Sequence, residues 1–554
     1  HRALVAVYPD PEYERGIDER LAARVRLFES GLDAAARERF LADQRAFHEA
    51  QARPDTAADL ARIPHLRPAD LPLAVDRIPT VAKALGTVPV LAHEQPTNGI
   101  AYLDLAIPVD VLEPADYPLL PFFASALTGM GLDGLSWVEA SSLTARLTGG
   151  LGAMLYSSSA ARVGAPDPGE GTLSPGLVGR DWLILRIKAL EELSRDAVTL
   201  AFRYLDEADF SDRKRLLDLL LEYRNDLESS LAPSGNQYAV SRAAYPFSRA
   251  KAIDEAWNGI SQIRFVRDLA RAAREKGGAE ALVSRLAAIR KRLASAGLVV
   301  NLTGTARALS SLEGALSACL SGRGAPDRPA STQIGDFLRL ASITGPVERE
   351  TANVAEKPAV FETLELASAS LQVGFASLVL PSPAFGSPDQ GIDVVLGHWL
   401  ANGPLWERIR TTGGAYGAYA YTDALEALFV LATYRDPQPL RSLDIFRGAI
   451  AEAAESEIDP VTLERTITGC YSREVQPRSP SDKGFTAFLR LLYGITDGAR
   501  ERKLARILSA TPAEVRVAAE RMRADWEVAR GALLAGKRHL KDAKKHDFAG
   551  ILES

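Results

Sequence analysis

Cysteine is nearly absent from this chain of 554 residues, which carries only Cys319 and Cys470. Two thiols so far apart in the sequence argue against a disulfide framework, and we interpret both as small buried hydrophobic side chains. Long apolar runs are also missing, because no stretch reaches the roughly 18 residues that a membrane span requires. Basic charge is not in excess, since 65 Lys and Arg residues stand against 71 Asp and Glu residues. The net charge of -6 therefore gives no electrostatic basis for nucleic acid as a main partner.

Common catalytic and metal-binding motifs are missing as well. The histidines form neither H-E-x-x-H nor H-x-x-E-H; His48 and His93 each precede a glutamate, but no second histidine follows at the required spacing. The chain also lacks a cysteine cluster, a G-x-S-x-G elbow, a Walker loop and a dinucleotide-binding glycine fingerprint. The sequence therefore predicts no metal ligand set within this chain.

What is present is the composition of a globular protein, with 47% apolar and 25% charged residues. Residues 1–7 (HRALVAV) are typical of a strand, so we assign residues 1–17 to the last strand of a preceding domain. Residues 18–76 are predicted to form a helical hairpin and a linker rich in Pro, Asp and Arg. Turn-rich residues 323–328 separate two further α/β domains, which we place at residues 77–325 and 326–554.

Apolar patterns predict the elements of these two domains. Strands at residues 88–91 and 100–107 are expected to pair across an Asn98-Gly99 hairpin. A long amphipathic helix is predicted over residues 180–205, and a closing strand over residues 298–303. In the second domain, strands are predicted at residues 371–380 and 425–433.

A short pattern occurs once in each domain. Residues 146–150 and 410–414 share the form R-x-T-G-G and lie 264 residues apart (410 − 146 = 264). In both copies an apolar, helix-like stretch precedes the glycines and a strand-like stretch follows. Two homologous α/β domains of about that length would produce such a repeat.

The second copy carries the residues with chemical potential. Gly413 and Gly414 suit a helix end, and the alternation that follows predicts a strand. Arg410 would lie in the last helical turn and Tyr416 at the start of the strand, so both polar tips could meet on one side. A fixed cation beside a phenol can stabilise the oxyanion of a tetrahedral intermediate. The alternative is an arginine favoured by the helix dipole and a tyrosine packed on the sheet.

Several segments resemble one known family. Residues 96–100 (PTNGI), 116–121 (DYPLLP) and 405–417 (LWERIRTTGGAYG) are similar to the carboxy-terminal half of the presequence proteases. These proteases belong to the pitrilysin family of zinc peptidases, which carry the inverted H-x-x-E-H motif. The double glycine at residues 149–150 and the opening residues 1–11 fit the same resemblance, which covers nearly the whole chain in order.

The resemblance implies a fold of class α+β, with two homologous pitrilysin-type α/β domains after the helical-hairpin linker. Their sheets would be mostly antiparallel with packed helices, and residues 77–325 and 326–554 would be the family's third and fourth domains. The resemblance also implies a zinc metalloendopeptidase whose two halves close around unstructured peptides. Zn²⁺ would be bound by the amino-terminal half and not by this chain, so this chain alone is expected to be inactive.

The family's fourth domain supplies an arginine and a tyrosine to the zinc site, and the motif carries these roles to Arg410 and Tyr416. Tyr416 would donate a hydrogen bond to the oxyanion, and Arg410 would hold the substrate carbonyl or the developing charge. Gly413 and Gly414 are expected to serve the turn, with substrate contact as a lesser role. The first copy of the repeat has Gly152 where Tyr416 would fall.

The expected partners are peptide substrates and the amino-terminal zinc-binding half, in the same polypeptide or as a separate chain. No nucleic acid and no membrane span are expected. A soluble protein of the bacterial cytoplasm is expected, or one of the mitochondrial matrix or another organelle in a eukaryote. The alternative is a catalytically inactive subunit of the same family with a structural or substrate-holding role. We interpret His93 as a strand-end residue and His398 as part of the core or chamber wall.

Overall fold

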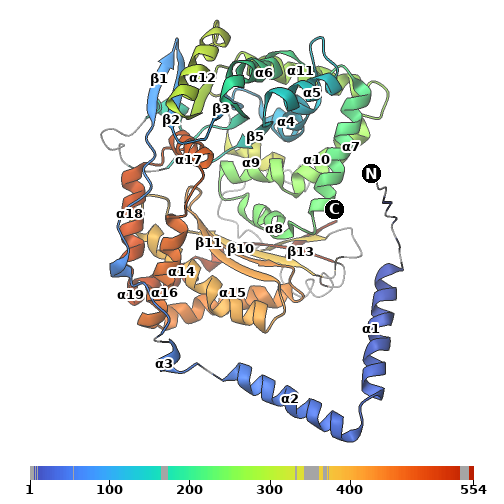
Figure 1. Ribbon diagram of the computed structural model, residues 1–554, viewed down its shortest axis with the longest axis vertical. Coiled ribbons are helices and arrows are strands. Elements are labelled where there is room, and N and C mark those ends of the chain that lie inside the picture. The colour runs from blue at the N-terminus through green and yellow to red at the C-terminus, as the bar shows by residue number, and fades with distance from the viewer. Residues whose placement is uncertain are drawn as a thin grey trace. The chain divides into compact units, whose positions relative to one another are not determined.

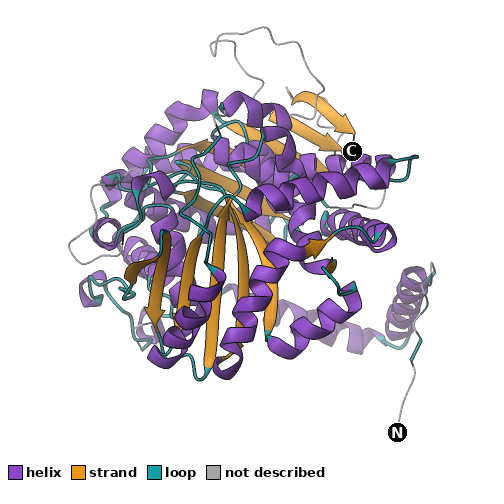
Figure 2. Ribbon diagram, turned by 90° about the horizontal axis from the view of Figure 1, so that it is seen from above, coloured by secondary structure: helices purple, strands orange, loops and turns teal. Residues whose placement is uncertain are grey.

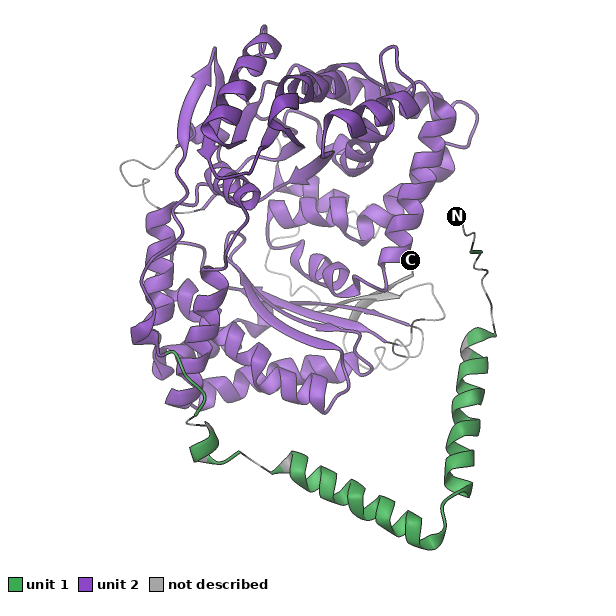
Figure 3. Cartoon of the chain, viewed as in Figure 1, with its two compact units in different colours: residues 1–66 green, residues 67–554 purple. Residues whose placement is uncertain are grey.

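The computed structural model describes the chain except residues 1–4, 7, 9, 11, 54, 61, 162, 164–171, 331–332, 342–360, 366–370, 372, 537–538, 540–547 and 554. Most of the strand predicted at residues 1–7 therefore lies outside the described residues. The chain forms two compact units, residues 1–66 and 67–554 (Figure 3). The finer domain boundaries proposed from the sequence stay predictions.

The first unit is helical. Its elements are α1 (Tyr13–Ser30), α2 (Ala34–Ala52) and the short α3 (Ala57–Leu60). Asp33 caps α2 by accepting a hydrogen bond of 2.7 Å from the backbone N–H of Ala36. The rings of Phe28 and Phe40 touch edge to face at 5.6 Å, and α1 and α2 diverge from there (Figure 3). The two predicted helices are present and meet near their turn.

The second unit contains two six-stranded sheets. The first sheet has the order β1-β2-β8-β3-β6-β5 and the second has the order β11-β12-β10-β13-β9-β14. The strands of the first sheet are β1 (Val81–Leu85), β2 (Val88–Glu94), β3 (Ile100–Pro108), β5 (Gly150–Tyr156), β6 (Trp182–Leu190) and β8 (Val299–Gly304). Those of the second are β9 (Phe361–Glu365), β10 (Phe375–Pro381), β11 (Gly417–Asp423), β12 (Leu428–Tyr434), β13 (Arg530–Ala535) and β14 (Phe548–Glu553). A small ladder joins β4 (Gly131–Leu132) to β7 (Ala208–Asp209).

The two sheets repeat one connectivity. In each sheet, the edge strand that follows R-x-T-G-G pairs with the next strand along the chain, β5 with β6 and β11 with β12. That strand pairs with the sheet's long central strand, β3 or β10, which in turn pairs with β8 or β13. All these pairs are antiparallel. The predicted α+β fold with two related, mostly antiparallel sheets is confirmed.

Two local predictions are wrong. Asn98 and Gly99 have the positive φ angles of a tight turn (51° and 80°), but β2 and β3 do not pair across it. Instead β8 lies between them, since its fully buried run takes the centre of the sheet. Residues 180–205 are not one helix, because β6 fills the first part and α6 (Ser194–Glu207) follows. A strand buried on both faces is a continuous apolar run, which periodicity cannot separate from a buried helix.

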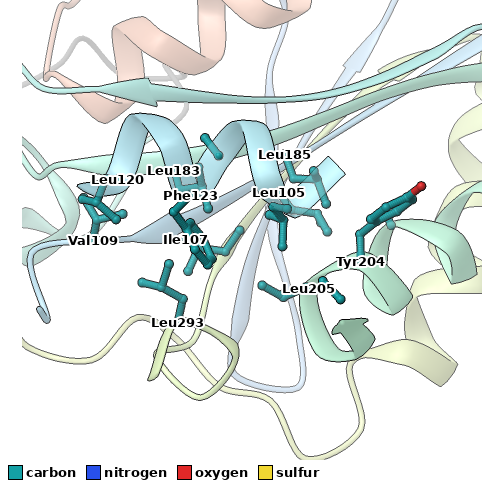
Figure 4. Packing of buried hydrophobic residues seen from close by; sticks show 14 of the residues in the cluster. Leu105, Ile107, Val109, Leu120, Phe123, Leu183, Leu185, Tyr204, Leu205 and Leu293 are labelled. Atoms are coloured by element: carbon teal, nitrogen blue, oxygen red, sulfur yellow. The ribbon is translucent and has the colours of Figure 1, made fainter. Parts of the chain in front are cut away.

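Helices enclose the strands on both sides (Figure 2). Around the first sheet these are α4 (Leu120–Gly129), α5 (Trp137–Leu147), α7 (Arg213–Ser230), α9 (Arg249–Asn258), α10 (Ile260–Ala272), α11 (Gly278–Ala294), α12 (Ala306–Cys319) and α13 (Ile334–Ala341). Around the second they are α14 (Pro388–Asn402), α15 (Pro439–Glu455), α16 (Pro460–Glu474), α18 (Asp497–Leu508) and α19 (Pro512–Ala524). Alternate residues of β3, such as Leu105 and Ile107, pack with Phe123 and Leu205 of the helices (Figure 4).

Two further helices are exchanged between the sheets. α8 (Gly235–Ala244) comes from the first half of the unit but packs on β10, β12 and β13 of the second sheet. α17 (Pro480–Leu492) comes from the second half but packs on β8 and β2 of the first sheet (Figure 1). Each approaches through a glycine: a side chain at Gly235 would overlap the ring of Phe375, and one at Gly484 would overlap Thr303. The exchange explains why residues 67–554 form one compact unit.

Candidate active site

The segment that carries the candidate site is wound differently from an ordinary helix. After α14, residues Trp406–Thr411 form a π-helical turn, and β11 begins at Gly417. The wide turn is closed by hydrogen bonds from Thr412 N–H to the Glu407 carbonyl (2.9 Å) and from Ala415 N–H to the Ile409 carbonyl (3.0 Å). Short π-helical turns are rare and occur frequently at functional sites.

The π-helical turn buries one side and exposes the other. Leu405 and Ile409 are buried as the sequence predicts, whereas the predicted partner in that stripe, Trp406, is 43% exposed. The Trp406 ring lies instead under the Arg410 guanidinium, whose central carbon is 4.2 Å from the ring centroid. This is a cation–π contact at the surface. The sequence interpretation of Trp406 as a core residue is therefore wrong.

Arg410 and Tyr416 lie together. The Arg410 guanidinium donates a hydrogen bond of 2.7 Å to the backbone carbonyl of Tyr416 and lies 5.5 Å from the Tyr416 ring. Tyr416 is 65% exposed, and its ring meets the Tyr434 ring edge to face at 5.8 Å. The structure thus places an exposed phenol beside a fixed cation, and their catalytic roles stay a prediction.

Gly413 and Gly414 shape the turn that joins the two residues. A Cβ at Gly413 would lie 2.5 Å from the Ile409 carbonyl oxygen and 2.8 Å from that of Arg408. Gly414 has φ +80°, a conformation that favours glycine. Both glycines are required by the backbone, and a contact of either with substrate stays a prediction.

The two copies of the repeat differ in the length of this connection. Gly150 opens β5 four residues after Arg146 (150 − 146), while Gly417 opens β11 seven residues after Arg410 (417 − 410). Gly149 N–H donates to the Lys188 carbonyl, as Tyr416 N–H donates to the Tyr434 carbonyl at the same place in the second sheet. By sheet position, Tyr416 corresponds to Gly149 rather than Gly152. The second copy has three more residues here, which form the turn that presents Tyr416.

The far end of β11 is anchored to the first sheet's half of the unit. Glu426, in the turn after β11, is buried and accepts hydrogen bonds from Ser159 N–H (2.8 Å), Ser159 Oγ (2.9 Å) and Ser248 Oγ (2.6 Å). Asp423 pairs with Lys251 at 2.6 Å. Polar contacts therefore fix the edge strand that begins beside Tyr416.

The histidines are placed in packing roles. His93 is fully buried and makes a hydrogen bond of 2.8 Å with Asn301, and burial lowers its pKa. His398 packs against Gly469, and burial together with the charge of Arg473 lowers its pKa to about 4. Neither side chain reaches the Arg410–Tyr416 pair by any contact that the described residues show.

Two searches of the described residues bear on metal binding and on membranes. They contain no group of three or more His, Cys, Asp or Glu side chains that could hold a metal ion. Among the helices of the described ranges, none has both the length and the apolar character of a membrane span. The residues present here do not fit a zinc site, so any zinc in a larger assembly would need ligands from elsewhere.

Comparison with known proteins gives consistent matches. The profile of the domain associated with peptidase family M16, subfamily C, matches residues 7–269, and that described as "PreP C-terminal domain" matches residues 385–522. Presequence protease 1, chloroplastic/mitochondrial, of Arabidopsis thaliana is 28% identical over 92% of this chain and 44% of its own length. The mitochondrial presequence protease of Danio rerio is 25% identical over 82% of this chain and 43% of its own length. The chain spans less than half the length of these curated relatives.

Solved structures show the same fold at low sequence identity. The peptidase M16 inactive domain from Pseudomonas fluorescens matches 83% of this chain and 98% of its own with a TM-score of 0.53 and 14% identity. A conserved protein from Enterococcus faecalis matches 83% of this chain and 99% of its own with a TM-score of 0.55 and 13% identity. These likenesses support the fold and say nothing by themselves about activity.

Proposed function

The chain belongs to the presequence-protease group of the pitrilysin-family metallopeptidases, and on this premise we propose that it is the metal-free, carboxy-terminal half of a zinc metalloendopeptidase. Its substrates would be unstructured peptides. Zinc bound by an amino-terminal half would supply a water of lowered pKa. The observation that carries the proposal is the Arg410–Tyr416 pair, held at the surface on a π-helical turn.

The residues of this chain would act on the substrate carbonyl. The exposed Tyr416 hydroxyl would donate a hydrogen bond to the carbonyl oxygen as it becomes negatively charged, and Arg410 would add a fixed positive charge beside it. The cation is already oriented by Trp406 and by the Tyr416 carbonyl, so little reorganisation is needed when charge develops. Donors arranged in advance for an oxyanion are typically worth about 10²–10³ in rate.

A mixing experiment tests this function. Cleavage of a quenched fluorescent peptide is measured with this chain alone, with an amino-terminal half carrying H-x-x-E-H alone, and with both halves and zinc. We expect cleavage only in the mixture, and its loss with a chelator. Cleavage by this chain alone would contradict the proposal.

A second candidate function is a catalytically inactive subunit with a structural or substrate-holding role. One solved structure of the same fold is described as an inactive domain, which favours keeping this candidate. The two candidates differ in what the complex does, since a stable complex that binds peptide without cleaving it would support the inactive subunit. Retention of both Arg410 and Tyr416 supports the catalytic function.

A further inference from the structure

Arg435 has an unusual backbone conformation for its residue type. Its φ is +48°, in the left-handed region that a non-glycine residue adopts rarely. Arg435 directly follows β12, whose last residue, Tyr434, packs on Tyr416. Such conformations persist when the surrounding structure imposes them, and they cluster at active sites and ligand clamps.

The next residue imposes this conformation. Asp436 is buried, and its carboxylate accepts hydrogen bonds from Gln438 N–H (2.8 Å) and Ser442 Oγ (2.5 Å). Its backbone pairs with Gly374 in both directions, at 2.7 and 2.8 Å. Because Asp436 is fixed inside, the chain must reverse at Arg435, and the Arg435 side chain is exposed.

The reversal places a second arginine next to the candidate active site. The Arg435 guanidinium lies 5.5 Å from the Tyr434 ring centroid, on the ring that also contacts Tyr416. Tyr416 N–H is shared between the Tyr434 carbonyl (3.0 Å) and the Arg435 carbonyl (3.4 Å). Arg435 is thus joined to Tyr416 through the backbone and through one intervening ring.

The charge of Arg435 is not neutralised by the protein. Within the described part of the chain, no carboxylate forms an ion pair with its guanidinium. Arg408, on the same π-helical turn as Arg410, instead donates hydrogen bonds of 2.8 and 2.6 Å to Glu452. A guanidinium stacked on an aromatic ring keeps its N–H donors for a planar acceptor such as a carboxylate.

We infer that Arg435 is a specificity residue that binds a carboxylate of the peptide substrate, close to the bond that Arg410 and Tyr416 act on. The inference rests on the proposed peptidase function and adds the chemistry of the preferred substrate. The carboxylate could belong to an Asp or Glu side chain or to the carboxyl terminus of the peptide, and both present the same acceptor geometry.

The test uses matched peptides and matched variants. One peptide series carries Glu or Gln at single positions around the cleaved bond, and a second pair ends in a free carboxylate or an amide. Arg435→Asn removes the charge while keeping a residue that tolerates the left-handed conformation, and Arg435→Lys keeps a charge. Arg441→Asn is the control, because it removes the same charge from an exposed arginine of α15.

In the assembled complex, we expect kcat/KM to favour the carboxylate-bearing peptide by about ten- to a hundredfold, the range for a hydrogen bond to a charged group. Arg435→Asn should abolish this preference and leave neutral peptides within about twofold, whereas Arg441→Asn should retain it. Which of the two peptide sets responds identifies the source of the carboxylate. A preference that survives Arg435→Asn, or an equal loss on charged and neutral peptides, would overturn the inference.

A binding measurement separates this inference from the proposed function. Fluorescence anisotropy reports the affinity of labelled Glu and Gln peptides for this chain alone, with no cleavage needed. If the assembled complex cleaves nothing but the chain still prefers the Glu peptide in an Arg435-dependent way, the peptidase proposal fails and the carboxylate site stands. No preference in the wild-type chain would overturn the carboxylate site.

Discussion

The guanidinium of Arg410 donates its 2.7 Å hydrogen bond to the backbone carbonyl of Tyr416, not to the phenol. The cation is therefore held by the main chain of the residue with which it is expected to act. The Tyr416 hydroxyl is left exposed, and among the described residues it has no hydrogen-bond partner. The contributions of the two side chains can consequently be separated by substitution.

Tyr416→Phe should lower kcat of the assembled enzyme by about 10²–10³, because it removes one oxyanion donor. The ring contacts with Arg410 and Tyr434 do not involve the hydroxyl, so the melting temperature should stay unchanged. Tyr419→Phe is the matched control, since Tyr419 lies on the same strand with 40% exposure. Equal turnover of the Tyr416 and Tyr419 variants would refute a catalytic role for Tyr416.

Trp406→Leu should reduce kcat by a few-fold, since an exposed cation–π contact is worth about 0.5–1 kcal/mol. Its effect should disappear in an Arg410→Met background, because Trp406 would act only by orienting Arg410. The measurement is a double-mutant cycle on kcat. Additive losses would instead show that Trp406 contributes independently of Arg410.

Gly484→Ala should destabilise the protein by about 1–3 kcal/mol, because the new methyl group overlaps Thr303 where α17 meets the first sheet. Gly314→Ala is the control in another helix, α12, where a Cβ has open space. This second change should be neutral or stabilising by about 0.5–1 kcal/mol, as expected for a glycine inside a helix. Urea denaturation compares both variants with the wild type, and similar midpoints for all three would contradict the close approach of α17.

Asp104 should make stability depend on pH. Burial raises its pKa from 3.8 to about 6, although Arg186 lies 3.1 Å away and Asn301 donates a hydrogen bond of 2.8 Å. A raised pKa means that the folded state binds the proton more tightly than the unfolded state, so stability is lost as the pH rises from about 4 to about 6. The loss is about 1.4 kcal/mol for each pH unit in that window.

The variant Asp104→Asn should lack this slope, because its amide does not titrate. Denaturation at several pH values between 4 and 7 would compare its free energy of unfolding with that of the wild type. Parallel curves would show that Asp104 does not carry the pH dependence.

Local sequence predicted the surroundings of Arg410 and Tyr416 well. The apolar residues Leu405 and Ile409, the double glycine and the alternation after it all indicated a turn between a helical segment and a strand, and the structure has these parts in that order. The π-helical winding could not be read from the sequence, because Trp406 fits an α-helical apolar stripe equally well. Its position under Arg410 became visible only with the wider turn.

Partners from other elements were not predictable in the same way. Tyr434 and Arg435 reach Tyr416 from the neighbouring strand, and no short motif links the two segments. The central position of β8 was missed for a related reason, since strand order depends on long-range pairing and not on the Asn98-Gly99 turn. Sequence periodicity reports which side of an element is buried, but not which distant element buries it.

The exchange of α8 and α17 has a consequence for synthesis on the ribosome. The last strand of the first sheet, β8, is complete at Gly304, whereas α17 begins at Pro480, 176 residues later (480 − 304). At about 5–20 residues per second, the apolar face that α17 will cover waits roughly 9–35 s for its partner. During that interval the nascent chain presents Leu91, Trp182 and Ile184 without Phe488 and Leu492 to cover them. A folding helper that shields this face would therefore be needed before the second sheet exists.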